Sequence, residues 1–210
     1  MVGRDGNQLT PWLRKAWRYG LPLAVVGLVG GAFVLGLSSQ FGRPEIARDD
    51  ESPTMLLDVP VFQAPPAVSA RSAALHPDAP VIGVSHLGHY RAYAIDAMSR
   101  SHSHVINDLL GGTPVTVAYC DRTRCARAFT APARAEPLDV SVGGWLNDGG
   151  VRDMLIRVGA HRYLLKSASP LGGGSPPFPY DRIEVEMSTW QEWSAAHPDT
   201  DVYLGGGRKL

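Results

Sequence analysis

Residues 104–130 gather the side chains of this chain that are best suited to chemistry. Within about one hairpin's length they include six candidates: His104, Asn107, Asp108, Cys120, Cys125 and Arg127. A carboxylate such as Asp108 can orient a histidine or act as a general base, and the amide of Asn107 can bind a substrate carbonyl. The alternative is structural, because Asn and Asp side chains also hydrogen-bond nearby backbone and shape turns such as the one expected at 109–112.

The two cysteines are expected to face each other across a hairpin. Residues 114–120 alternate β-branched, aromatic and small side chains as strands do, residues 121–124 suit a turn, and residues 125–130 return. Opposed residues bring their Cβ atoms within about 4.5–5.5 Å, close to the roughly 3.5–4.5 Å that a disulfide needs. We therefore predict a disulfide between Cys120 and Cys125. Nearby arginines would depress a thiolate pKa, so a labile redox pair, a metal ligand and a lone nucleophile stay open as alternatives.

The same register predicts that one face of this hairpin belongs to the core. Its members are alternate apolar side chains: Val115, Val117, Tyr119, Ala126 and Ala128. The opposite face carries Ala118, Cys120, Arg127 and Phe129.

Arg91 and Tyr119 complete the candidate ligand-binding set, together with Asn107. An arginine within a strand can cross to pair with Asp96 or Asp108, and it can instead bind an anionic ligand. Tyr119 is interpreted as a core aromatic residue whose hydroxyl is hydrogen-bonded.

Three ordered segments of the chain carry a recognisable pattern. They read VIGVSHLGHYRAYAI from residue 81, VINDLLGGTPVTVAYC from residue 105 and TWQEWSAAHPDTDV from residue 189. Together they resemble the DUF3179 family over residues 79–204. The family has no assigned function, so the resemblance implies an architecture and not a mechanism. Many members carry C-x-x-C starting at the position of Cys120, but Thr123 stands at the second cysteine here, which counts against that redox or metal role.

Composition and motifs exclude several function classes. The 20 acidic and 20 basic residues balance, so the chain has no electrostatic footprint for nucleic acid. The seven histidines match no zinc spacing, although His104 is the best placed of them, beside the Asn-Asp pair. The motifs G-x-S-x-G and H-E-x-x-H and a phosphate-binding loop are absent from the sequence. We predict no nucleic-acid partner and no metal site, and we assign no cofactor.

The N-terminal part predicts a membrane anchor. Residues 20–41 are uncharged and mostly apolar, and a transmembrane helix needs about 20 such residues. Basic charge precedes them, so the positive-inside rule places residues 1–19 in the cytoplasm and the rest in the periplasm or outside the cell. A cleavable signal peptide is the alternative. Residues 42–79, rich in Pro, Ala, Ser and charge, are interpreted as a linker, and residues 80–205 as the domain.

Short strands dominate the prediction for this domain. We expect a hairpin over 80–93 with its turn near 87–88, an edge strand within 55–62, and further strands at 138–145, 154–158, 163–166 and 182–187. Short helices are expected within 94–100 and, N-capped by Ser188 or Thr189, over 190–196. The predicted class is α+β, predominantly antiparallel β, as a barrel- or sandwich-like sheet with short helices, plus one N-terminal transmembrane helix.

Two function hypotheses follow, and neither fixes an oligomeric state. The first is a non-catalytic binding or envelope-associated module, whose partner is the lipid bilayer and either an envelope protein or a small ligand. The second is a thiol-redox or metal-assisted enzyme built around one pocket. It would use His104, Asp108, Cys120, Cys125 and Arg127. The second hypothesis requires these side chains to converge within about 4–8 Å on a concave surface.

Overall fold

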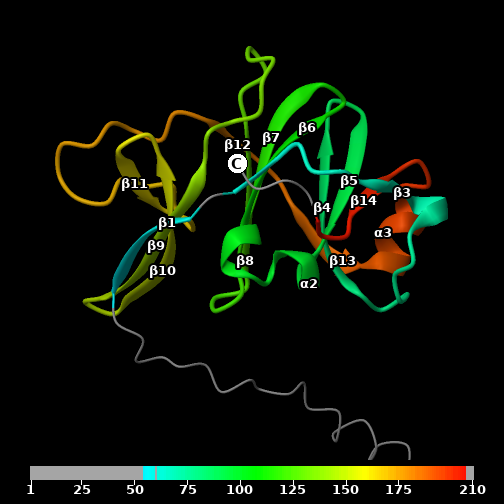
Figure 1. Cartoon of the computed structure of the whole chain (residues 1–210), viewed down its shortest axis with the longest axis horizontal. Helices are drawn as coiled ribbons and strands as arrows, with labels where there is room; N and C mark the ends of the chain where they lie inside the picture. The colour runs from blue at the N-terminus through cyan, green and yellow to red at the C-terminus, as the bar shows by residue number, and fades with distance from the viewer. Residues whose placement is uncertain (1–53, 60, 207–210) are drawn as a thin grey trace, which may run out of the picture. The chain divides into compact units, whose positions relative to one another are not determined.

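The computed structural model describes residues 54–59 and 61–206, which fold mainly into short strands (Figure 1). The strands in chain order are β1 (Met55–Val59), β2 (Phe62–Gln63), β3 (Val68–Ser69), β4 (Pro80–His86), β5 (His89–Ala94), β6 (Val105–Leu110), β7 (Thr113–Cys120), β8 (Cys125–Thr130), β9 (Ser141–Asp148), β10 (Val151–Val158), β11 (His161–Leu164), β12 (Asp181–Ile183), β13 (Glu186–Thr189) and β14 (Asp201–Tyr203). The helices are the 3₁₀ turns η3 (Ala70–Ser72) and η4 (Ser101–Ser103) and the α-helices α2 (Ile95–Met98) and α3 (Trp190–Ala196). The predominantly β, α+β class expected from the sequence is confirmed.

The expected anchor lies outside the described residues. The same holds for the expected cytoplasmic segment, residues 1–19, and for residues 42–53 of the expected linker. Across 54–59 and 61–206, no helix combines the length and the apolar character that crossing a membrane requires.

The described strands form three sheets. Sheet A has the order β1-β9-β10-β11, sheet B the order β12-β8-β7-β6-β2, and sheet C the order β13-β4-β5-β14-β3. Most neighbouring strands are antiparallel, as expected. The exceptions are β2, which runs parallel to β6, and β14, which runs parallel to β5.

Sheet B forms the middle layer of a sandwich. One buried cluster joins Phe129 of sheet B to Trp145 of sheet A. A second buried cluster joins Val117 of sheet B to Ile82 of sheet C. Figure 1 shows the layers in this order, with β9–β11 in yellow, β6–β8 in green and β4–β5 in teal. The sandwich-like alternative is therefore the observed one, with three layers instead of one sheet.

The central hairpin has the predicted register, but both of its faces are buried. Cys120 lies opposite Cys125 across a four-residue turn. Val117 and Tyr119 pack toward sheet C, as predicted. Ala118 and Phe129 pack toward sheet A. The second face of the hairpin, which was expected to lie outside the core, is therefore buried as well. A strand covered on both faces carries a nearly continuous apolar run, as β7 does.

Helix α3 covers the outer face of sheet C. Thr189 caps it in a full capping box with Glu192, which confirms one of the two predicted N-caps. Trp190 and Trp193 are both buried in the cluster under the helix, as their shared helical face predicts. Gly83 makes this packing possible, because a Cβ at that position would overlap the Trp193 ring.

Two stretches differ from their sequence-based expectations. Residues 182–187 were expected to form one strand, but β12 pairs with β8 in sheet B and β13 pairs with β4 in sheet C. Local alternation of apolar residues cannot show where a chain changes its pairing partner. Within residues 42–79, β1 joins the edge of sheet A as the expected edge strand, and β2 and β3 join sheets B and C. The folded unit therefore includes residues from 55 onward.

Candidate functional site

Four polar side chains form one hydrogen-bonded group, here called the Arg91 network: Arg91, Tyr93, Asp108 and Asp201. The Arg91 guanidinium donates to Asp108 Oδ2 at 2.7 Å, and to both carboxylate oxygens of Asp201 at 2.6 Å each. The Tyr93 hydroxyl donates to the same Asp108 Oδ2 at 2.9 Å. The backbone N–H of Leu109 donates to Asp108 Oδ1 at 2.7 Å, so both oxygens of Asp108 are occupied.

The strand pairing explains why these residues meet. β5 and β14 are neighbours in sheet C, and their parallel register places Asp201 beside Arg91. Asp108 comes from β6 in sheet B, and its side chain reaches Arg91 across the interface between sheets B and C. The predicted pairing of Arg91 with Asp108 is confirmed, whereas Asp96, the other suggested partner, makes no ion pair with it.

Electrostatics keep Arg91 and Tyr93 of this network protonated, as their raised pKa values show. Burial opposes the charge of Arg91, but its bonds to Asp201 and Asp108 outweigh that effect and raise the pKa of Arg91 above its ordinary value. Burial also raises the pKa of Tyr93 well above its ordinary value, and the charge of Asp108 adds to the shift. The guanidinium therefore stays charged and the phenol stays a donor. With its oxygens occupied, Asp108 is not placed to act as a general base.

Asn107 faces the opposite side of sheet B and is fully buried. Its Nδ2 donates to the Val140 carbonyl at 2.9 Å, and its Oδ1 accepts from the Thr116 hydroxyl at 2.6 Å. The Val140 N–H approaches the same Oδ1 at 3.4 Å. The structural interpretation of Asn107 is supported, but the side chain fastens a distant segment and does not shape a local turn.

The predicted disulfide between Cys120 and Cys125 is absent, and both residues are free thiols. Their register is the predicted one. The physical reason is that opposed Cβ atoms lie about 4.5–5.5 Å apart in a regular antiparallel pair, which is wider than most disulfides allow. The strands would have to pucker to close the bond, and they remain regular here.

The Cys125 thiol shows no sign of activation. Burial raises the pKa of the Cys125 thiol, and the nearby Arg127 offsets this shift only in part. The Arg127 guanidinium donates instead to the backbone carbonyls of Ala126 at 2.7 Å and Lys166 at 3.2 Å. At neutral pH the thiol form of Cys125 therefore prevails.

His104 lies beside a different acid from the one expected. Its Nδ1 is 2.8 Å from the Met98 carbonyl oxygen, and its Nε2 is 3.7 Å from Asp121 Oδ1. Tyr119, a suggested ligand-binding residue, is buried between sheets B and C.

The residues proposed for an enzyme do not converge. Asp108 pairs with Val115, five residues before Cys120 along β7, which corresponds to about 17 Å. Their side chains also face opposite sides of sheet B. Across the described part of the chain, no three His, Cys, Asp or Glu side chains are grouped closely enough to hold a metal ion.

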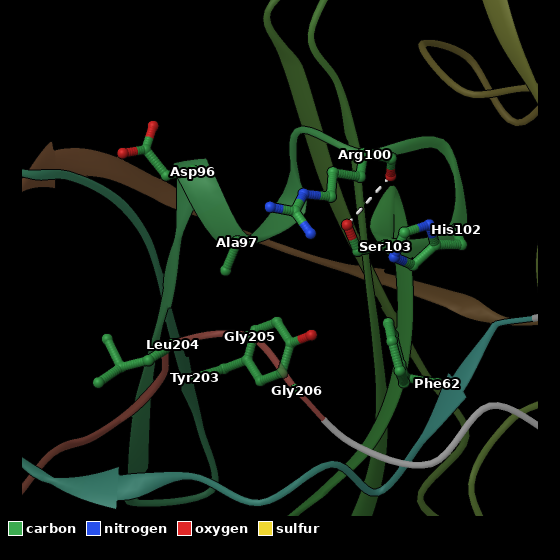
Figure 2. Close-up of a pocket in the computed structure, with 10 residues that line it drawn as sticks. All are labelled: Phe62, Asp96, Ala97, Arg100, His102, Ser103, Tyr203, Leu204, Gly205 and Gly206. Carbon is green, nitrogen blue, oxygen red and sulfur yellow. Dashed lines mark hydrogen bonds between the residues drawn. The ribbon is translucent and has the colours of Figure 1, made fainter.

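An open pocket of about 310 Å³, here called the Tyr203 pocket, lies near the Arg91 network. Figure 2 shows its lining side chains, which come from α2, η4, β2 and the end of β14. They are Phe62, Asp96, Ala97, Arg100, His102, Ser103, Tyr203, Leu204, Gly205 and Gly206. This volume lies at the lower end of the range for small-molecule sites, about 300–1,000 Å³.

Tyr203 connects the pocket with the network. Its ring lies 6.2 Å from the ring of Tyr93, centroid to centroid. Its hydroxyl is buried and has no hydrogen-bond partner. Burial raises the pKa of Tyr203, and the charge of Asp108 adds to this, so the hydroxyl keeps its proton.

Asp201, Tyr203 and Arg100 were not among the site residues predicted from the sequence. Asp201 lies within the third recognised pattern and Tyr203 directly follows it, whereas Arg100 ends the stretch expected to be a short helix. Nothing in local spacing reveals that β14 runs beside β5, so these residues could not be joined to Arg91 in advance.

Comparison with known proteins gives a match to a family profile. No curated protein and no solved structure matches the chain. The profile described as protein of unknown function (DUF3179) matches residues 50–206, about three quarters of the chain. The resemblance seen in the three sequence segments is confirmed, and the chain belongs to the DUF3179 family.

Proposed function

We propose that this chain is a non-catalytic module that binds a small ligand in the Tyr203 pocket and is held outside the cytosol by an N-terminal anchor. One observation carries the binding function: the pocket is lined by Tyr203, whose buried hydroxyl has no hydrogen-bond partner in the described part of the chain. An unmade hydrogen bond of a buried donor costs about 1–3 kcal/mol, so a ligand that supplies the acceptor gains that free energy.

The non-catalytic part of the proposal is supported by the polar groups nearby. Three charged groups near the pocket, those of Arg91, Asp108 and Asp201, bind one another in the Arg91 network. The thiols and His104 lie elsewhere.

A fragment screen tests the binding function. The full chain in lipid nanodiscs would be screened by ligand-observed NMR against small polar fragments, beside Ala97→Trp and Ala160→Trp. Ala97 lines the pocket, so a tryptophan there fills it, whereas Ala160 lies in the exposed β10–β11 turn. We expect fragments that bind the parent and Ala160→Trp to lose binding to Ala97→Trp. Fragments that bind all three chains equally, or a screen without hits, would contradict the proposed site.

The anchor is tested separately. The apolar run at residues 20–41 and the basic residues before it support this part of the proposal. Protease added to sealed right-side-out membrane vesicles should digest the C-terminal domain and spare a tag fused before residue 1. A protected C-terminal domain, or chain released by a carbonate wash, would refute the anchored topology.

A further inference from the structure

The Tyr203 pocket contains an arginine without an ion-pair partner among the described residues, and this bears on the chemical class of the ligand. Arg100 ends the segment after α2, and its guanidinium has no ion pair or hydrogen bond with any described residue. Only its backbone carbonyl is engaged, by the Ser103 N–H at 2.8 Å and the Ser103 hydroxyl at 3.0 Å. Figure 2 shows the guanidinium on the same side of the pocket as Ala97, above the Tyr203 ring.

Three arginines elsewhere in the domain are paired with carboxylates, whereas Arg100 is exposed and pairs with no described carboxylate. Arg91 binds two carboxylates, and Arg157 and Arg162 both reach Asp58 at 2.9 and 3.2 Å. Arg100 therefore presents a planar, permanently charged donor group to an open space. Such a group matches the two oxygens of a carboxylate or phosphate.

Tyr203 supplies a second donor. Its side chain is 1% exposed, and its hydroxyl oxygen is shielded from water and lacks a partner. The phenol keeps its proton, so it needs an acceptor and cannot serve a cation by ionising. Because the hydroxyl is shielded, a ligand in the pocket reaches it only if the side chains around the Tyr203 ring shift.

Negative charge around the pocket limits the charge of the ligand. Asp96 also lines the pocket, and its carboxylate makes no ion pair in the described structure. Behind Tyr203, the single charge of Arg91 faces two carboxylates, those of Asp108 and Asp201. One unpaired guanidinium beside this excess of carboxylates favours a single negative charge over two.

Resting on the proposed function, we infer that the ligand of the Tyr203 pocket is a small organic monocarboxylate. Its carboxylate is held by Arg100 and by the Tyr203 hydroxyl. Its apolar part lies against Phe62 and Ala97, which line the same space. Apolar walls with a few convergent polar groups are the usual composition of small-ligand sites.

Benzoate, its neutral analogue benzamide, and inorganic phosphate test this inference. Each would be titrated into the full chain in nanodiscs, with binding followed by isothermal titration calorimetry and NMR. We expect benzoate to bind at least about tenfold more tightly than benzamide or phosphate, since a hydrogen bond to a charged group contributes about 1.5–3 kcal/mol. Arg100→Gln should remove this preference, and Tyr203→Phe should weaken benzoate severalfold.

The matched control is Arg71→Gln, which removes an exposed arginine of η3 that does not line the pocket. It should leave benzoate binding unchanged, and thermal unfolding would verify that each variant folds. Equal binding of benzoate and benzamide would overturn the carboxylate inference and leave the binding function standing. Phosphate binding as tight as benzoate, or benzoate binding unaffected by Arg100→Gln, would overturn it as well. Absence of benzoate binding would also overturn it, whereas the fragment screen judges the binding function independently.

Discussion

Asn107 and Asp108 are neighbours in β6, yet they serve opposite faces of the central sheet in different ways. Asp108 enters a charged network that reaches Asp201, whose side chain is 33% exposed. Asn107 is fully buried and meets only neutral partners, Thr116 and the Val140 peptide. The comparison shows that charge is placed where a network extends to water, and a neutral amide where burial is complete. This arrangement agrees with the high cost of burying a charge away from both water and a partner.

The largest expected effect tests the side of sheet B that carries Asp108. Asp108→Ala leaves the Arg91 guanidinium with one carboxylate and the Tyr93 hydroxyl without an acceptor. We expect a loss of about 3–5 kcal/mol in the free energy of unfolding, because one partner of a buried pair is removed. Urea unfolding followed by tryptophan fluorescence measures this loss.

Asp201→Ala is the matched comparison for that variant. The Asp201 carboxylate is partly exposed, so water can replace some of its hydrogen bonds to Arg91. We therefore expect a smaller loss in the free energy of unfolding, about 1–2 kcal/mol. Equal losses from the two variants would show that depth of burial does not distinguish the two acids.

The second effect tests the opposite side of sheet B, which carries Asn107. Asn107→Ala leaves the Thr116 hydroxyl and the Val140 carbonyl unpaired in a dry interior. We expect it to cost about 2–3 kcal/mol, measured in the same urea experiment. Thr116→Val should cost less, about 1 kcal/mol, since Asn107 keeps its bonds to Val140. A variant at Asn107 as stable as the parent would mean that water or another side chain replaces the amide.

The third effect concerns the thiols on the same face as Asn107. Because burial raises the pKa of Cys125, its alkylation by iodoacetamide at pH 7 should be at least about tenfold slower than in the unfolded chain. Both cysteines should react after unfolding without reductant, which a mass spectrum would show as two added labels. A chain that takes up no label when unfolded would instead contain the disulfide.

The smallest effect concerns Asp153, a buried acid of β10. Asp153 Oδ2 accepts the Lys166 N–H at 3.0 Å, whereas Oδ1 is buried without a partner. Burial raises the pKa of Asp153 above its ordinary 3.8, so the folded protein holds this proton more tightly than the unfolded chain. This contribution to stability is complete below pH 3.8 and is lost as the pH rises through the raised pKa.

Asp153→Asn should remove that part of the pH dependence. The variant and the parent should be equally stable in acid, and the variant should gain by up to about 1 kcal/mol at neutral pH. Urea unfolding at a series of pH values measures the difference. A constant difference at every pH would assign it to packing and not to ionisation.

Local patterns predicted much of the architecture. The register of the β7–β8 hairpin, the β4–β5 turn at Leu87 and Gly88, and the capping box of α3 all follow from short-range chemistry. The turn shows why: Leu87 and Gly88 both have positive φ, at 50° and 80°, and glycine accepts this conformation freely. The disulfide prediction was wrong because register alone does not bring two sulfurs to bonding distance.

The candidate site was beyond reach of the same reasoning. Arg91, Asp108 and Asp201 come from three strands, and Asp201 follows Arg91 by 110 residues. A period of two residues assigns a side chain to a face, but it does not state which sheet covers that face.

By itself, the sequence determined the family, the strand-rich class and the pairing of neighbouring strands, because these depend on residues close together in the chain. Only the tertiary structure decided that sheet B is covered on both faces, that Asn107 and Asp108 serve different layers, and that Arg100 and Tyr203 border one pocket. The physical reason is that such contacts depend on the parallel pairing of β14 with β5 and on the stacking of three sheets. Both are set by the burial of apolar surface over the whole domain, which short-range patterns do not encode.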